Sequence, residues 1–489
     1  MSSKVTVSVS NTTSDIAVAA AARGQAHLRS FGIAGCDGFG AQVCITSVSV
    51  TVISSDETLD ERTDYSYAVD YAALGAGRVH EVRATAASPF GVEYALETVA
   101  QLAKKKCRTF AVSDAPAFPH RGLMIDTGRR FYGVGLVESI LDGMAMYKMN
   151  VLHMHLSELC FRVESKLFPK LHLRPCVAGG LDNSEYYTQD DVARLVAYAR
   201  ARGIRIIPEF DMPGHSGGLC AGLAPYGIQC CATGYQILDD AGGQSVNVVT
   251  RLLGEMTGLF PDAVFNVGGD ETGSTAPCTL NDTRSFEEKV LRYVNNTLGK
   301  VPMGWEEILF KTGAAATVPR TIIDAWARSS WQAAAKLGHR AVASNYPNLY
   351  LDFATTFAPA LWFDMTGGSA ANASFLLGGE TSMWQDFYVP GARTKAQGSA
   401  SCLFDDARDA DFANSTAAMI WPRAAIAAGS FYRYDAKRLD AASTDFSDLL
   451  NQITADLAAR GAHPCPCATT TAIGCDQNTF CGHVFCPDG

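Results

Sequence analysis

Residues 263–271 read Ala-Val-Phe-Asn-Val-Gly-Gly-Asp-Glu: a short, mostly apolar segment that stops at two glycines and two acids. Such a segment is typical of a buried strand that ends in a turn. After residue 119 the arrangement recurs, and apolar strands that end in polar or aromatic residues alternate with segments of helical spacing. This alternation predicts a (β/α)8 TIM barrel, an α/β fold.

The expected strands share apolar character and lie at fairly regular intervals. They are Arg121–Asp126, Asn150–Leu156, Ile204–Phe210, Ala263–Asp270, Val301–Glu306, Thr321–Trp326, Ala341–Asn345 and Gly379–Trp384. Expected helices include 136–149, 284–298, and one that Thr188 caps and that runs to Arg202 before Gly203. A doubly wound open sheet is the alternative, but no Gly-rich phosphate loop follows the first strand.

A small α+β domain is expected ahead of the barrel, over residues 1–118. Segments 5–9 and 48–52 alternate apolar and polar residues like half-exposed strands, and 92–104 is an amphipathic helix. Two prolines in 114–119 mark a linker. We therefore expect the barrel over 119–460 and a short Cys-rich tail over 461–489.

The composition excludes several function classes. Hydrophobic residues make up 47% and charged residues 18% of the 489-residue chain, as in a well-buried globular protein. A formal net charge of −10 argues against a nucleic-acid partner. No run approaches 18 apolar residues, so we expect no membrane span.

Cysteines and sequons bear on the compartment. The chain has 15 cysteines, five of them in the tail, and Asn-x-Ser/Thr sequons at Asn11, Asn281, Asn295, Asn372 and Asn414. These features favour a secreted or lysosomal/vacuolar glycoprotein with disulfide bonds, although residues 1–4 do not resemble a signal peptide. The tail has two interpretations, a disulfide-stapled segment or a zinc knot. The vicinal pair Cys230-Cys231 cannot be assigned from sequence.

The acids at the end of segment 263–271 suggest proton transfer. Adjacent carboxyls repel each other, and burial raises the pKa of at least one of them. A carboxyl that stays protonated near neutrality can act as a general acid while its charged neighbour stabilises a cation. An Asp-Glu pair after a turn is also common in solvated loops. The residues at the other strand ends therefore distinguish a catalytic pair from a loop.

Those strand ends carry acids, one arginine and several tryptophans. They include Asp126, Arg129, His153, His155, Glu158, Glu209, Asp211, His215, Asp270, Glu271, Trp305, Glu306, Trp326, Tyr350, Asp352, Trp384 and Asp386. In a barrel these residues meet at one rim. Indoles cover the apolar face of a pyranose, and carboxylates and arginine bind its hydroxyls, so the rim is suited to a sugar.

The motifs resemble the family 20 glycoside hydrolases, the β-N-acetylhexosaminidase family. The strings that carry the resemblance are RGLMIDTGRR, KMNVLHMHL, RGIRIIPEFDMPGHS, FNVGGDET, MGWEEIL, NLYLDF, GGETSMW and IWPRAA, in order between about residues 90 and 430. The resemblance implies a (β/α)8 barrel behind a small α+β domain. It also implies a retaining exo-hydrolase in which the substrate's own 2-acetamido group is the nucleophile.

The resemblance further implies a role for each matching residue. Glu271 matches the general acid, and Asp270 the carboxylate that orients the acetamido nitrogen. Tyr350 matches the hydroxyl that holds the acetamido carbonyl. Trp305, Trp326 and Trp384 match the indoles around the acetamido methyl group and the sugar ring. Arg129, Asp352 and Asp386 match the groups that bind the sugar hydroxyls.

The chain departs from the family pattern at two site positions. The second strand continues as His155-Leu-Ser-Glu158-Leu-Cys-Phe, where the family usually has two acids, H-x-D-D-Q-x-W. Glu158 is expected to replace the acid that supports His215, with a carboxylate shifted by one methylene. Asp386 stands where many members carry Glu. Phe353, next to Asp352, offers no arginine for acidic sugars, so we expect neutral substrates.

Two other functions remain open on the sequence alone. One is a metal-dependent amidohydrolase-type barrel, suggested by His153 and His155 on one side of a strand. The other is a non-catalytic carbohydrate-binding protein, suggested by the altered second-strand motif. The expected function is exo-β-N-acetylhexosaminidase activity without metal or other cofactor. Its partner would be a glycan containing GlcNAc or GalNAc: a chito-oligosaccharide, an N-glycan or a glycolipid. The family also often forms homodimers.

Overall fold

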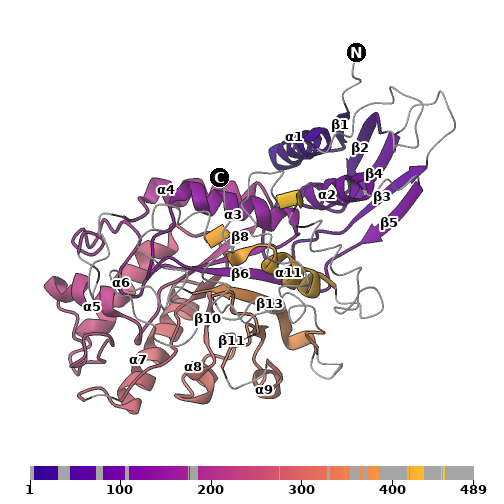
Figure 1. The fold of residues 1–489 in the computed structure, drawn as a ribbon. Helices are drawn as coiled ribbons and strands as arrows, with labels where there is room; N and C mark the ends of the chain where they lie inside the picture. Colours follow the sequence, from indigo (N-terminus) through magenta and orange to yellow (C-terminus); the bar gives the residue numbers. More distant parts are fainter. Residues whose placement is uncertain are drawn as a thin grey trace, which may run out of the picture.

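A five-stranded sheet with two helices stands beside an eight-stranded barrel in the computed structural model (Figure 1). The structure describes residues 5–30, 45–72, 81–104, 109–174, 176, 185–274, 276–327, 331–346, 348–352, 364–366, 373–384, 416–417, 419–433, 453 and 455–457. The tail after residue 460 and Asp386 lie outside these ranges. Within the described residues, the helices are too short or too polar to cross a membrane.

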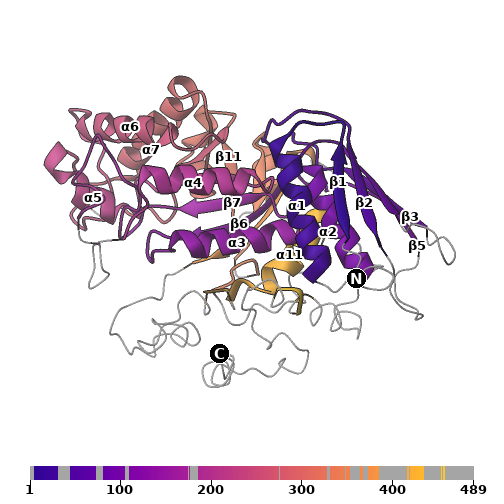
Figure 2. The same cartoon turned by 90° about the horizontal axis from the view of Figure 1, so that it is seen from above.

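The N-terminal sheet has the strand order β1-β2-β4-β3-β5. Its strands are β1 (Thr6–Ser10), β2 (Ser47–Val52), β3 (Tyr67–Ala72), β4 (Glu81–Ala86) and β5 (Thr109–Asp114). Helices α1 (Asp15–Ser30) and α2 (Gly91–Lys104) cover its barrel-facing side, as Figure 2 shows. In β2 the valines at 48, 50 and 52 are buried, and the hydroxyl residues between them are half-buried. The alternation therefore predicts correctly which face packs on the helices.

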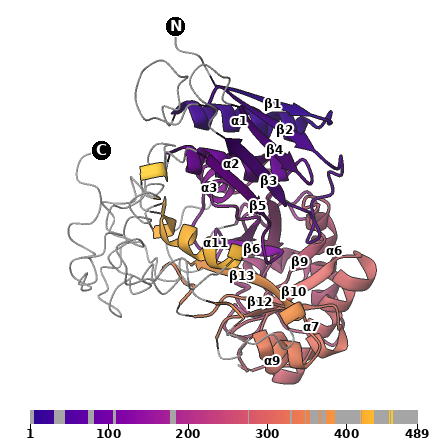
Figure 3. The same cartoon turned by 90° about the vertical axis from the view of Figure 1, so that its right-hand side faces the viewer.

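The barrel consists of parallel strands and closes where β13 pairs with β6. Its strands are β6 (His120–Asp126), β7 (Val151–His155), β8 (Arg205–Glu209), β9 (Val264–Asn266), β10 (Val301–Trp305), β11 (Ile322–Ala325), β12 (Ala341–Ala343) and β13 (Leu376–Met383). Its α-helices are α3 (Val134–Met146), α4 (Gln189–Arg200), α5 (Gly217–Leu223), α6 (Gln244–Thr257), α7 (Leu280–Arg292), α8 (Glu307–Phe310), α9 (Trp331–Lys336) and α11 (Arg423–Arg433). Figure 3 shows α11 beside β6 and β13, at the closure.

The expected strands all form, with differences at their ends, and the structure adds elements that were not expected. Helix α4 begins at the predicted cap, where Thr188 and Asp191 make a reciprocal capping box, but it ends at Arg200. Helix α7 begins before the expected residue 284, because Thr279 and Asp282 form a second capping box. Helix α1 and strands β3, β4 and β5 have no counterpart in the sequence-based prediction; the three strands are short, with mixed patterns.

The barrel interior is layered from apolar to polar to aromatic. Its apolar layer includes Val151, Ile207, Val264 and Val301. His153 and Glu209 are buried two residues after Val151 and Ile207 on the same strands, and so they face the same side. The third layer, nearest the carboxyl ends, is an aromatic cluster of Met124, Trp305, Tyr350 and Trp384, with Trp326 packed against it. The aromatic cluster therefore lies where barrel enzymes carry out their chemistry.

Three disulfides lie in the described part of the chain. They join Cys160 to Cys176, Cys220 to Cys230 and Cys231 to Cys278. The vicinal cysteines 230 and 231 therefore belong to two different bridges. One bridge leads to α5 and the other to the segment that follows the Asp270-Glu271 pair, so both brace the loops at the carboxyl rim.

Candidate active site

The two acids lie on a turn that only glycine can form. After β9, Gly268 and Gly269 have φ angles of 68° and 98°, and Glu271 itself has a φ of 44°. A Cβ on Gly268 would lie 1.8 Å from Oδ1 of Asp211, and one on Gly269 would lie 2.3 Å from Ile308. The N–H of Gly269 donates to Asp211 Oδ1 at 2.9 Å. The turn is thus fixed by close packing on both sides, and it carries Asp270 inward and Glu271 outward.

His215 lies between the two acids. Its Nε2 is 3.5 Å from Oδ2 of Asp270 and 3.4 Å from Oε2 of Glu271. Its Nδ1 is 3.1 Å from Oε2 of Glu158. Although burial opposes it, the charges of Asp270 and Glu158 raise the pKa of His215 well above its usual value. His215 is therefore a cation that three carboxylates share.

Glu158 links His215 to an arginine. Its Oε1 is 3.4 Å from Arg129 Nη2, and Arg129 Nη1 donates to Asp126 at 2.8 Å. The N–H of Glu158 donates to the carbonyl of Cys160 at 2.9 Å, which turns the chain back on itself. The longer arm of Glu158 therefore still reaches His215, the contact that the sequence left in doubt.

Aromatic side chains lie next to these charged groups at the rim. The guanidinium of Arg129 lies 5.4 Å from the ring centre of Trp384, and the centroid of Trp384 is 5.6 Å from that of Trp305. Tyr350 is 6.3 Å from Trp384 and stacks on Trp326 at 6.2 Å. Hydrogen-bonded acids and apolar rings thus alternate around one rim, as a sugar with polar edges and apolar faces requires.

The two catalytic candidates differ in burial and in proton affinity. Asp270 is 8% exposed, and burial raises its pKa despite the His215 cation. Burial and the charge of Asp270 also raise the pKa of neighbouring Asp211 well above its usual range. Both buried carboxyls therefore bind a proton more readily than free aspartate does, Asp211 markedly so. The Glu271 side chain is 60% exposed, and the hydrogen bond from His215 lowers its pKa. A raised pKa at one of the two acids was expected, and it is found at Asp270.

The remaining expected ligands fall into two groups. Asp352 is 1% exposed, and its charge acts on Tyr350, so it adjoins the aromatic cluster. Asp386 falls outside the described residues. Among the residues expected at this site, the structure therefore brings together Arg129, Glu158, His215, Asp270, Glu271, Trp305, Trp326, Tyr350, Asp352 and Trp384.

The histidines that suggested a metal site are held by glutamates. His153 Nδ1 is 2.8 Å from Glu380, and its Nε2 is 2.9 Å from Glu209. His155 Nδ1 lies 2.8 Å from the same Glu209 oxygen. Although burial opposes it, the two glutamates raise the pKa of His153 well above its usual value. Both ring nitrogens of His153 therefore face carboxylates, in a buried network that also includes His155.

Three residues at the rim had no assigned role in the sequence-based prediction. Asp211 supports the glycine turn, and Glu209 accepts the indole N–H of Trp305 at 2.7 Å. Glu307 accepts the indole N–H of Trp326 at 3.1 Å. Their common signal is an acid directly at or after a strand end, but such a signal does not say which neighbour the acid contacts.

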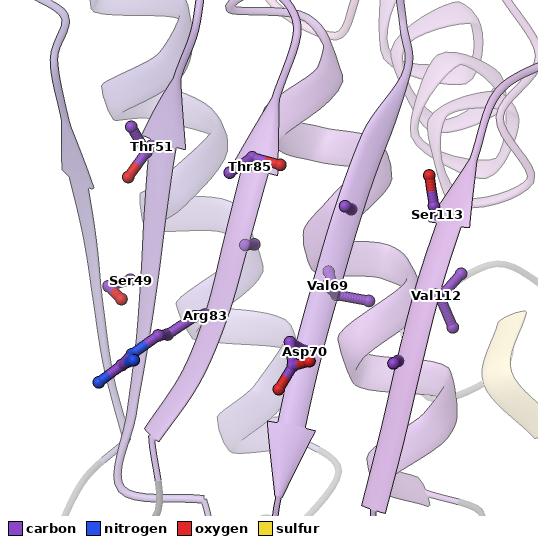
Figure 4. A pocket seen from close by; sticks show the side chains of 11 residues that line it. Ser49, Thr51, Val69, Asp70, Arg83, Thr85, Val112 and Ser113 are labelled. Carbon is purple, nitrogen blue, oxygen red and sulfur yellow. The ribbon is translucent and has the colours of Figure 1, made fainter.

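A second hollow lies far from these acids, on the open face of the N-terminal sheet. It has a volume of about 570 Å³, and Ser49, Thr51, Asp70, Arg83 and Thr85 are among its lining residues. Figure 4 shows these side chains on the side of the sheet opposite the helices. Small and hydroxyl side chains dominate it, and it lacks the aromatic faces of the barrel rim.

Comparison with known proteins agrees with this geometry. The model of "Glycosyl hydrolase family 20, catalytic domain" matches residues 118–433. This chain belongs to glycosyl hydrolase family 20. The protein is therefore a glycoside hydrolase, and its interpretation as a metal-dependent amidohydrolase-type barrel is wrong.

Relatives resemble this family 20 enzyme over most of its length. Beta-hexosaminidase 1 of Arabidopsis thaliana is 29% identical over 78% of this chain and 71% of its own length. The human beta-hexosaminidase subunit beta is 29% identical over 61% of this chain and 59% of its own length. The Flavobacterium johnsoniae chitobiase structure covers 95% of this chain and 71% of its own, with 25% identity and a TM-score of 0.73.

Proposed function

We propose that this enzyme is a retaining exo-β-N-acetylhexosaminidase that removes terminal GlcNAc or GalNAc by substrate-assisted catalysis. The observation that carries the proposal is the Asp270-Glu271 turn. It places one buried and one exposed carboxyl side by side, with His215 in contact with both, next to a cluster of indoles. The names of the relatives support the same activity.

In the first step Glu271 donates its proton to the leaving oxygen while the acetamido oxygen of the substrate attacks the anomeric carbon. The C–O bond to the leaving group breaks, and an oxazolinium ion forms. Asp270 is the anion that orients the acetamido N–H and stabilises the positive charge. Burial and the charge of Asp270 raise the pKa of neighbouring Asp211 well above its usual range, which favours a neutral Asp211 beside that anion. In the second step Glu271 accepts a proton from water, which attacks the anomeric carbon as its bond to the acetamido oxygen breaks. The acetamido group is restored, and the two steps together retain the configuration at the anomeric carbon.

The pKa of Glu271 in the substrate-free enzyme fits a proton donor that works best in acid. The hydrogen bond from His215 lowers this pKa, so Glu271 is protonated only at low pH. A bound sugar would cover the exposed carboxyl, and loss of water raises a carboxyl pKa. We therefore propose an acidic optimum, in keeping with a lysosomal, vacuolar or secreted location.

The other rim residues would bind the sugar. Trp305 and Trp384 would enclose the acetamido methyl group and the ring, together with Trp326, and Tyr350 would donate to the acetamido carbonyl. Arg129, Asp352 and Asp386 would hold hydroxyls away from the scissile bond. The reach of Glu158 to both Arg129 and His215 supports this assignment. The substrate would be a neutral amino-sugar glycan.

The decisive experiment compares aryl N-acetyl-β-glucosaminide, N-acetyl-β-galactosaminide and plain β-glucoside as substrates. Substrate assistance needs the acetamido group, so the glucoside should be inert, and rapid glucoside hydrolysis would exclude the mechanism. Glu271→Gln should lower kcat by a factor on the order of 100 or more for poor leaving groups. The loss should be smaller for activated aryl groups, because these need less protonation. Asp270→Asn should slow every substrate.

A further inference from the structure

Two adjacent glutamates accept hydrogen bonds from the backbone and from the indole ring of Trp326, one of the tryptophans at the rim. Glu306 Oε2 accepts the backbone N–H groups of Trp326 at 3.1 Å and of Ala327 at 3.2 Å. Glu307 Oε2 accepts the indole N–H of Trp326 at 3.1 Å. Glu306 and Glu307 follow β10, whereas Trp326 follows β11, so the contacts join two neighbouring loops of the barrel.

Trp326 is the indole of this rim that most needs such support. Trp305 and Trp384 are 1% and 6% exposed, and the core around them fixes their rings. Trp326 is only half-buried. One face stacks on Tyr350 with an interplanar angle of 21°, and Tyr346, which is 46% exposed, meets it edge-on. A half-buried ring has room to turn about its side-chain torsions, and a hydrogen bond at Nε1 selects one orientation.

Glu307 also lies near the acids that carry out the reaction. Burial raises its pKa to about 7, and the charge of Asp270 contributes to that shift. A carboxyl of this kind beside Asp270 resembles a second proton donor. Its Oε2, however, is committed to the indole of Trp326. Either protonation state can accept that N–H, because a protonated carboxyl keeps acceptor capacity.

We propose that Glu307 is a positioning residue that sets the plane of Trp326 against the bound sugar, while Glu306 fixes the backbone beneath it. The role of Trp326 as a sugar platform rests on the proposed function. Glu307 acts through the indole and does not exchange a proton with the substrate. Loss of the acceptor therefore weakens substrate binding more than it slows the chemical step.

The test uses variants of Glu307, Glu306 and Trp326 and one surface control, with aryl N-acetyl-β-glucosaminide as the substrate. Glu307→Ala should raise KM about tenfold with a smaller fall in kcat, because a hydrogen bond to a partly buried group is lost. Glu307→Gln should largely restore KM, since its amide oxygen can accept the indole N–H. In a Trp326→Phe background Glu307→Ala should have no further effect, whereas Glu306→Ala still should. Glu288→Ala, at an exposed ion pair of α7, is the surface control.

A second readout does not depend on turnover. Acrylamide quenching of Trp326 fluorescence, isolated by difference from Trp326→Phe, should increase in Glu307→Ala and return in Glu307→Gln. Additive effects of Glu307→Ala and Trp326→Phe on KM, or equal damage by Glu307→Gln and Glu307→Ala, would overturn the proposal. Wild-type enzyme that hydrolyses no amino sugar would instead overturn the proposed function, and the quenching result would then decide whether Glu307 holds the indole.

Discussion

Glu271 and His215 show at the scale of single residues how one contact sets a working pH. The imidazolium of His215 faces Asp270, Glu158 and Glu271, all within 3.5 Å. A carboxylate that accepts a hydrogen bond from a cation loses its proton at lower pH. The contact with His215 therefore lowers the pKa of Glu271, the proposed acid, in the free enzyme, while burial raises the pKa of Asp270.

Replacing His215 should shift the pH profile in a definite direction. In His215→Asn the hydrogen bond that lowers the pKa of Glu271 is gone, so this pKa rises. Glu271 then keeps its proton to higher pH, and the alkaline limb of the kcat/KM profile should move upward. Initial rates between pH 3 and 8 measure it. His27→Asn, on helix α1 of the sheet unit, is the control. An alkaline limb that stays in place or moves downward would contradict the assignment.

At the scale of elements, the turn after β9 depends on glycine. Gly268 and Gly269 both need positive φ angles, and a Cβ at either position collides with Asp211 or Ile308. Glu271, with a φ of 44°, is the non-glycine residue of the turn in this strained region, and such strain is common at functional sites. The turn thus explains why two adjacent acids a few residues after the short strand β9 differ in exposure.

Alanine substitutions at three glycines with positive φ separate the cost of a Cβ collision from the cost of the backbone conformation. Gly268→Ala and Gly269→Ala should each abolish most activity and lower the free energy of unfolding by about 2–4 kcal/mol, since strain and overlap add. Gly299→Ala is the matched control, because Gly299 has a φ of 67° but open space at its Cβ. It should cost only about 1 kcal/mol and leave activity intact. Urea unfolding and steady-state rates provide both measurements. Equal costs at all three positions would show that packing against Asp211 and Ile308 is unimportant.

At the scale of the whole molecule, the sheet unit and the barrel share a polar, aromatic junction. The hydroxyl of Tyr65 donates to the carbonyl of Gly203 at 2.8 Å, and Arg121 Nη2 donates to Tyr94 at 2.6 Å. Lys148 donates to the hydroxyl of Tyr67 at 2.6 Å and to Thr98 at 2.7 Å. Burial lowers the pKa of this lysine from 10.5 to about 8. One cation at the junction therefore responds to alkaline pH.

The stability of the junction should rise with pH. Between about pH 8 and 10.5 the unfolded chain keeps the proton of Lys148 while the folded protein releases it, so the unfolded state binds more protons. Wild type should therefore gain stability relative to Lys148→Met over that range, by at most about 1.4 kcal/mol per pH unit. Urea unfolding of both proteins at pH 7.5 and 9.5 tests it. A difference between the two that does not change with pH would exclude this role.

Much of the architecture could be predicted from local patterns, because strand and helix periodicity are properties of neighbouring residues. The cap at Thr188 and the strand that leads to Asp270 are examples, and both form as expected. The mixed segments of β3 to β5 could not be assigned, since their faces are distinguished only once they pair. The Cys-rich tail and Asp386 stay predictions.

In the barrel, local sequence patterns predict the order of the strands and the residue types at their carboxyl ends. Which of these residues meet depends on the folded chain. Glu158 contacts His215, Glu307 contacts Trp326, and Cys230 and Cys231 bond to different partners. Hydrophobic periodicity is a property of residues close together in the chain. Which groups a carboxylate can contact depends instead on how strands far apart in the sequence close into a barrel. The pairing of β6 with β13 creates that closure.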